Sequence, residues 1–150
     1  MSLNLKLVSE FQTIQRRPFE LVDGTLLNPV ASNPLIDGEF LELDATTYRM
    51  LRGTANPALV PSFCFFAERG RYETQAIGKG PFLYMGPYEA DTKVMDATGL
   101  AVGDALEVAN VLIGGVNKRA LVKATTGYVI GRVTRLPAYN SGWLRFIRVG

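Results

Sequence analysis

The strongest structural signal in the chain is residues 100–117, which read LAVGDALEVANVLIGGVN. Residues 100–108 contain a Val-Gly-Asp turn and lead into a short apolar strand. Residues 111–117 have the pattern of a β-hairpin, because Gly114 and Gly115 supply the positive φ angles that a tight turn requires. The stretch therefore predicts antiparallel β-structure with a Gly-Gly turn.

Short strands bounded by turn residues continue on both sides of this hairpin. Gly131 lies inside one of them, where a bulge or a close approach of another backbone is the usual cause. Turn signals recur at roughly 8–12-residue spacing, which predicts an all-β fold, either a small β-barrel, a β-tulip or a sandwich. The other expected strands are residues 19–22, 39–44, 62–67, 82–85, 120–124, 128–136 and 143–149.

The first part of the chain, residues 1–17, is expected to form an N-terminal extended arm ahead of a single β domain at residues 18–150. Its apolar residues fit both a strand and a helix pattern, so periodicity leaves its conformation open. Pro18 closes the segment. Helical patterns of ten or more residues are missing from the sequence, although residues 46–52 and 91–98 could each hold a short helix.

The composition is that of an ordinary globular domain. The chain has 150 residues, of which 47% are hydrophobic and 20% charged. No apolar run approaches the roughly 18 residues needed to span a bilayer, and the N-terminus does not have the pattern of a signal peptide, so we expect no membrane association. Cys64 is the single cysteine and lies between aromatic residues, so it is expected to be a buried structural thiol rather than a nucleophile.

The charge distribution is asymmetric. After Glu107 the chain has seven basic residues and no acidic one. This asymmetry favours self-association or docking on an acidic partner, nucleic acid included. Alternatively, the first half of the same fold supplies the counter-charges.

Most catalytic chemistry is excluded by residue type. Without histidine, Ser-His-Asp and Cys-His catalysis and histidine-based zinc sites are impossible. A single cysteine rules out thiolate zinc sites and iron–sulfur clusters. Residues 78–81, GKGP, lack the flanking glycine and Ser/Thr of a phosphate-binding loop. We therefore expect a protein that is not an enzyme, with no cofactor, no metal site and no small-molecule substrate.

Two alternatives keep some support from the residues. Glu42 and Asp44 would share one face of a strand, and paired carboxylates can hydrolyse glycosidic bonds, although a solvated strand face is the simpler interpretation. The C-terminal strands also place arginines near aromatic rings, as single-strand-binding β domains do. The pairs are Tyr128 with Arg132, Trp143 with Arg145 and Phe146 with Arg148. Trp143 and Phe146 fall on opposite strand faces, however, so at least one of these two rings is expected in the core.

The last third of the chain resembles the head-decoration, or capsid-cement, proteins of tailed bacteriophages. The resemblance rests on residues 100–108 and on residues 126–133, TGYVIGRV, followed by residues 143–149. It implies a β-barrel or β-tulip domain that sits as a homotrimer at local three-fold positions of an expanded shell. An extended arm would clamp neighbouring subunits. Many shorter decoration proteins have no insertion as long as residues 45–98.

We therefore expect a virion protein, made in the host cytoplasm, that binds the outside of the capsid and bridges major capsid protein subunits. The alternatives are another virion component, such as a tail-tube, tail-completion or baseplate protein, or a single-stranded nucleic-acid-binding domain. The expected contact residues are Leu3, Leu5, Leu7, Phe11 and Ile14 as arm anchors, Arg16 and Arg17 on acidic rims, and Arg145 and Arg148 at subunit or capsid contacts.

Overall fold

The computed structural model describes residues 4–8, 15–67 and 78–148. Strands dominate it, which confirms the all-β prediction. No helix in these residues has the length and apolar character to cross a bilayer. The elements are β1 (Leu5–Leu7), β2 (Gln15–Glu20), the 3-10 turn η2 (Gly24–Leu27), β3 (Phe40–Leu43), β4 (Met50–Leu51), β5 (Ser62–Phe65), β6 (Lys79–Met85), β7 (Tyr88–Thr92), β8 (Ala105–Ile113), β9 (Val116–Lys123), β10 (Gly131–Arg135), η4 (Pro137–Tyr139) and β11 (Leu144–Arg148).

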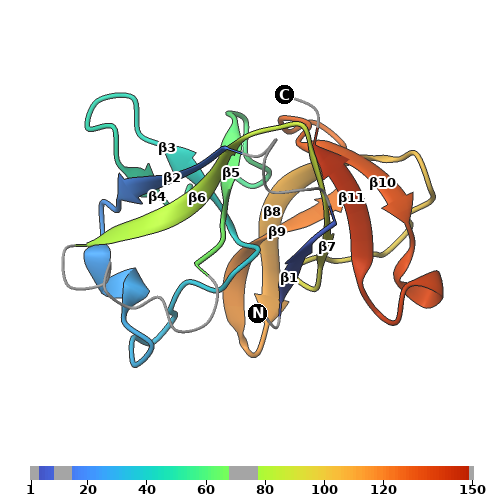
Figure 1. Ribbon diagram of the computed structural model, residues 1–150, viewed down its shortest axis with the longest axis horizontal. Coiled ribbons are helices and arrows are strands. Elements are labelled where there is room, and N and C mark those ends of the chain that lie inside the picture. Colours follow the sequence, from blue (N-terminus) through green and yellow to red (C-terminus); the bar gives the residue numbers. More distant parts are fainter. Residues whose placement is uncertain (1–3, 9–14, 68–77, 149–150) are drawn as a thin grey trace.

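The strands form two antiparallel sheets. The six-stranded sheet has the order β1-β7-β11-β10-β8-β9, and the five-stranded sheet has the order β2-β6-β5-β3-β4. Figure 1 shows the five-stranded sheet on the left and most of the six-stranded sheet on the right, with β8 and β9 near the middle. Each sheet therefore draws strands from both halves of the sequence.

The β8–β9 hairpin confirms the strongest sequence prediction. Ile113 pairs with Val116, and the two residues between them, Gly114 and Gly115, have φ angles of 62° and 83°. Both values lie in the left-handed region that glycine adopts without a steric penalty. The predicted close approach at Gly131 is also confirmed, because a Cβ atom there would lie 2.1 Å from the carbonyl oxygen of Ile147.

The main core lies between the two sheets. The five-stranded sheet contributes Cys64 and Leu83, and the six-stranded sheet contributes Leu106, Leu121 and Phe146, all fully buried. Alternate residues of these strands face this layer, as the period of a β-strand requires. The predicted buried position of Cys64 is confirmed.

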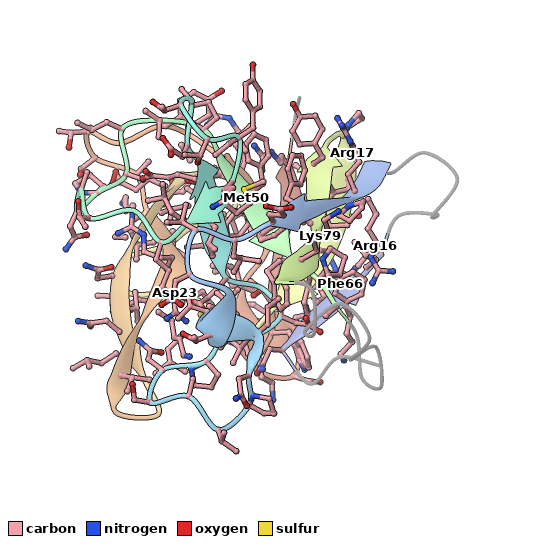
Figure 2. All side chains as sticks on the ribbon, turned by 90° about the vertical axis from the view of Figure 1, so that its left-hand side faces the viewer. Arg16, Arg17, Asp23, Met50, Phe66 and Lys79 are labelled. Atoms are coloured by element: carbon pink, nitrogen blue, oxygen red, sulfur yellow. The ribbon has the colours of Figure 1, made fainter. Side chains whose placement is uncertain are left out.

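A second, smaller core lies inside the five-stranded sheet, because this sheet curls. The N–H of Val22, just after β2, donates to the carbonyl of Met50 in β4 at 2.9 Å, so the two edges of the sheet meet. Figure 2 faces this side, with Met50 beside β2. Met50 and Phe82 are buried inside the curl, and Leu27 of η2 packs against them.

The described residues of the predicted arm lie within the sheets. Leu5 is buried in the main core and pairs with Thr92, whereas β2 runs on through Pro18 to Glu20. Proline is compatible with this strand because β2 is an edge, and the missing N–H of Pro18 faces away from β6. The described parts of residues 1–17 are thus held by backbone pairing on this chain itself.

Three local predictions were wrong. Residues 46–52 and 91–98 hold no helix, since Met50–Leu51 is β4 and residues 91–92 belong to β7. Residues 128–130 precede β10 as a loop, where the N–H of Tyr128 donates to the carbonyl of Ala58. Residues 46–52 instead form the turn and second strand of the hairpin with β3, whereas in the other two segments partners far along the sequence override the local pattern.

Candidate functional site

The predicted contact residues do not gather on one surface. Leu3, Phe11 and Ile14 lie outside the described residues. Leu5 and Leu7 belong to the main core or pack against it. Arg16 donates to the carbonyl of Ala67 and lies over the ring of Phe66, and Arg17 lies over the ring of Tyr84, 4.8 Å from its centroid.

The two predicted C-terminal arginines have separate roles. Arg145 forms a two-pronged ion pair with Asp91, with distances of 2.8 Å and 3.2 Å. Arg148 is buried, donates to the carbonyl of Ser62 at 2.6 Å and lies over the ring of Phe63. Arg148 therefore joins the two sheets inside the protein and is not available on the surface.

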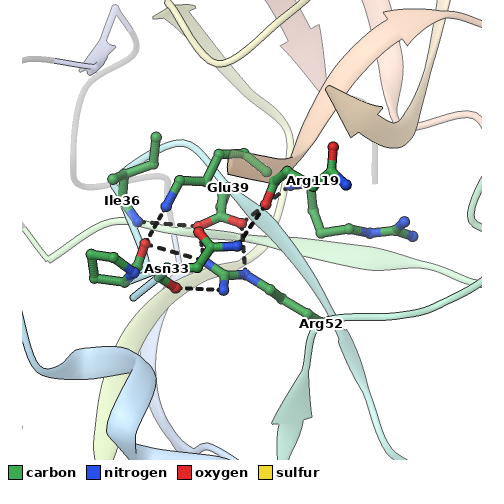
Figure 3. Close-up of polar contacts among 8 residues, drawn as sticks. Asn33, Ile36, Glu39, Arg52 and Arg119 are labelled. Carbon is green, nitrogen blue, oxygen red and sulfur yellow. Dashed lines mark hydrogen bonds and ion pairs between the residues drawn. The ribbon is translucent and has the colours of Figure 1, made fainter. Parts of the chain in front are cut away.

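A buried ionic cluster joins the sheets on the β3–β9 side (Figure 3). The carboxylate of Glu39, fully buried, accepts hydrogen bonds from the guanidinium of Arg52 at 2.8 Å and 2.9 Å. It also accepts from the N–H groups of Ile36 and Arg119. Since Arg119 lies on the outer edge of β9, Glu39 satisfies a strand edge that would otherwise be open.

The cations of this cluster are held by protein groups. The Arg119 guanidinium donates to Asn110 and to the carbonyl of Ala55, and lies 3.6 Å from Glu42. The Lys118 ammonium donates to the carbonyl of Pro34. Burial lowers the pKa of Lys118, and the nearby Glu39 partly offsets this effect. The cluster therefore ties the segment around Glu39 and Arg52 to β9 through hydrogen bonds and ion pairs.

Glu42 and Asp44, the two carboxylates considered for glycoside hydrolysis, contact different groups. Glu42 faces Arg119. The side chain of Asp44 accepts hydrogen bonds from the Thr47 hydroxyl and the Thr46 N–H, and these bonds lower its pKa. A general acid for glycoside hydrolysis needs a raised pKa, whereas the hydrogen bonds to Asp44 lower its pKa. Burial raises the pKa of the Cys64 thiol, which disfavours the nucleophilic thiolate.

The aromatic residues of the C-terminal strands do not form a stacking platform. Phe146 is fully buried in the main core. The Trp143 ring is half-buried and has the Lys6 ammonium over it, 4.0 Å from its centroid. Base stacking needs an open ring face. Of the three rings, Tyr128 alone is well exposed.

Two loops that lie far apart in the sequence carry four exposed apolar side chains, which we call the apolar patch. Its members are Leu59 and Val60 from the β4–β5 loop and Tyr128 and Val129 from the β9–β10 loop, each 43–65% exposed. The loops are joined by the hydrogen bond from Tyr128 to Ala58, whose own side chain is buried. Clustered exposed apolar side chains on a monomer mark interaction sites far more often than scattered ones do.

Glu107 holds one half of the apolar patch in place. Its side chain is buried, and one carboxylate oxygen accepts the N–H groups of Thr125, Thr126 and Gly127. The opposite loop is fixed by the bond from the Ala58 N–H to the carbonyl of Val108. Both loops are therefore anchored to β8, and the patch is a preorganised surface.

The charge asymmetry of the sequence is mostly resolved within the fold. Of the seven basic side chains after Glu107, three are buried and two others form ion pairs with acidic residues from residues 1–107. Arg132 and Arg135 on β10 are exposed, with no carboxylate within ion-pair distance in the described parts of the chain. The buried residues are Lys118, Arg119 and Arg148, and the ion pairs are Lys123–Asp104 and Arg145–Asp91.

The apolar patch was missed because its residues look like ordinary core. Residues 58–60, ALV, lie between two prolines beside a predicted core strand, and Tyr128 was assigned to the following strand. A short apolar run bounded by prolines is the one signal that could have indicated an exposed loop. Comparisons with protein-family models, curated protein sequences and solved structures found no match.

Proposed function

We propose that this protein is a capsid cement protein of a tailed bacteriophage, which binds the outside of the shell and stabilises it by bridging major capsid protein subunits. The exposed apolar patch is the observation that carries the proposal. It supplies a rigid surface suited to another protein. The resemblance of residues 100–108, 126–133 and 143–149 to decoration proteins supports a capsid as the partner.

The size of the patch indicates how binding would work. Its side chains are roughly half exposed, so burying each contributes about 1 kcal/mol at roughly 25 cal/mol per Å². Four side chains then contribute about 4 kcal/mol, which only matches the lower end of the roughly 4–15 kcal/mol cost of association. One patch alone therefore binds weakly.

Several patches acting together would overcome this weakness. In a homotrimer at a local three-fold position, three copies of the patch face the shell at once. The second and third contacts are then effectively intramolecular and multiply the affinity without new types of contact. The proposal therefore includes self-association as part of the mechanism.

The test replaces two patch residues, one from each loop. The double variant Leu59→Ser/Val129→Ser should co-sediment with expanded shells that lack this protein at least about 30-fold more weakly than the parent, because about 2 kcal/mol of burial is lost per contact. The matched control is Leu112→Ser, which removes a 71% exposed leucine near the tip of the β8–β9 hairpin. It should bind normally. Failure of the parent protein to bind shells, or equal binding by both variants, would refute the proposal.

A further inference from the structure

The outer face of the six-stranded sheet carries a row of charges. Lys6 on β1 lies opposite Asp91 on β7, and Asp91 lies opposite Arg145 on β11. The neighbouring residues Ala90 and Phe146 are buried in the core, so the charged side chains point away from it. A lysine, an aspartate and an arginine thus follow one another across three strands.

The row continues onto β10 with a like charge. A register shift lets Val133 pair with Phe146 and Arg135 with Arg145, so that Thr134 is the extra residue of a bulge. Thr134 also points to the outer face, where its hydroxyl donates to Glu89 at 2.9 Å. Arg135 and Arg145 therefore oppose each other directly. Like charges in this position destabilise a sheet.

Further cations surround this row. Arg132 on β10 is exposed and lies opposite Ile147. Lys93 follows β7, and its ammonium lies 4.9 Å from the centroid of the Trp143 ring. Across β1, β7, β11 and β10, the described residues of this face thus include five cations and two carboxylates, Asp91 and Glu89. The five cations, which define the basic face, are Lys6, Lys93, Arg132, Arg135 and Arg145.

We propose that the basic face is a second docking surface, which binds an acidic protein surface. The excess of cations is complementary to such a partner. Asp91 forms its ion pair with Arg145, so the opposing Arg135 remains an exposed cation that a partner's carboxylate can bind. A half-buried tryptophan two positions before an arginine also matches the residue types of binding hot spots.

The observations favour protein over nucleic acid as the acidic partner. Glu89 lies on this face in β7, between β1 and β11, and its carboxylate would repel a continuous phosphate backbone. The Trp143 ring is covered by Lys6 on a face that a base would need. A protein partner can place acidic residues at the cations and leave Glu89 clear of its own carboxylates.

The first experiment uses the full-length protein with labelled poly-L-glutamate at low salt. Fluorescence anisotropy of the label measures affinity, and the emission of Trp143, the single tryptophan, reports binding at this face. We expect saturable binding with a change in Trp143 emission, and weakening as salt is raised. An oligo-dT strand of equal charge should bind less tightly. Absence of binding to poly-L-glutamate, or tighter binding of oligo-dT, would overturn the proposal.

Two variants with the same change in charge separate the face from general electrostatics. Arg135→Glu replaces a positive charge by a negative one at an exposed site, a change of two charge units. It should weaken poly-L-glutamate binding by about tenfold. Its melting temperature should not fall, because a glutamate opposite Arg145 replaces a like-charge pair. The control is Lys79→Glu, because Lys79 lies on the five-stranded sheet (Figure 2). This variant should change binding by less than about twofold. Equal weakening by both variants would overturn the proposal. Because no shell is present, this measurement tests the basic face separately from the apolar patch.

Discussion

Replacing Glu39 by glutamine should be among the most destabilising neutral-for-charged substitutions in this protein. The carboxylate is fully buried and accepts four hydrogen bonds, two from the Arg52 guanidinium and one each from the N–H groups of Ile36 and Arg119. An amide of the same shape has one acceptor oxygen, and its NH₂ group would face a donor. The substitution also leaves the Arg52 charge without its carboxylate.

The expected magnitude follows from the burial of this pair. Breaking a buried, hydrogen-bonded ion pair by removing one partner costs about 3–5 kcal/mol. The Arg52 side chain is 16% exposed, so water can reach part of it, and we expect the lower end, about 3 kcal/mol. Hydrogen bonding at the edge of β9 would also weaken, because the Arg119 N–H would have to share the single acceptor oxygen of the amide.

The assay is urea unfolding followed by circular dichroism and by Trp143 emission. The matched control is Glu20→Gln, the same chemical change in the exposed pair between Glu20 and Arg49, where both side chains are about half exposed. It should cost no more than about 1 kcal/mol. If Glu39→Gln cost as little as Glu20→Gln, with both proteins still folded, the structural role assigned to the buried cluster would be refuted.

Three other substitutions test separate parts of the argument. Burial raises the pKa of Asp91, but hydrogen bonds from Arg145 and Asn140 outweigh this effect and lower the pKa overall. The contribution of Asp91 to stability is therefore lost as the pH falls below about 4. In acid titrations, the unfolding free energy of Asp91→Asn should fall less steeply than that of the parent. Glu107→Gln should cost about 1–3 kcal/mol and raise hydrogen exchange at residues 125–127, whose N–H groups the carboxylate accepts; unchanged exchange there would contradict its role in positioning the apolar patch. Gly131→Ala should cost about 2–3 kcal/mol in unfolding free energy, because its Cβ would lie 2.1 Å from a backbone oxygen. Gly142→Ala is the comparison: its Cβ would meet open space, but the φ of 86° is unfavourable for alanine, so it should cost about 1 kcal/mol.

The candidate surfaces were less predictable than the fold. The position of Arg145 on a strand could be predicted, but its ion pair with Asp91 could not, because these residues are separated by 54 positions in the chain. Leu59 and Val60 have the same apolar character as the core residues Cys64 and Phe65 a few positions later. Residue type alone does not state whether an apolar side chain will find a neighbour to cover it.

Local patterns were enough to predict most of the short strands, the Gly-Gly hairpin at residues 114–115 and the buried thiol of Cys64, because alternation and turn preferences act between residues a few positions apart. Contacts across the whole chain decided three features. They are the continuation of β2 through Pro18, the ion pairs of three C-terminal cations and the meeting of the two loops that carry the apolar patch. Strand pairing and ion pairing gain their free energy from partners that only the folded chain brings together, so no local window of sequence contains them.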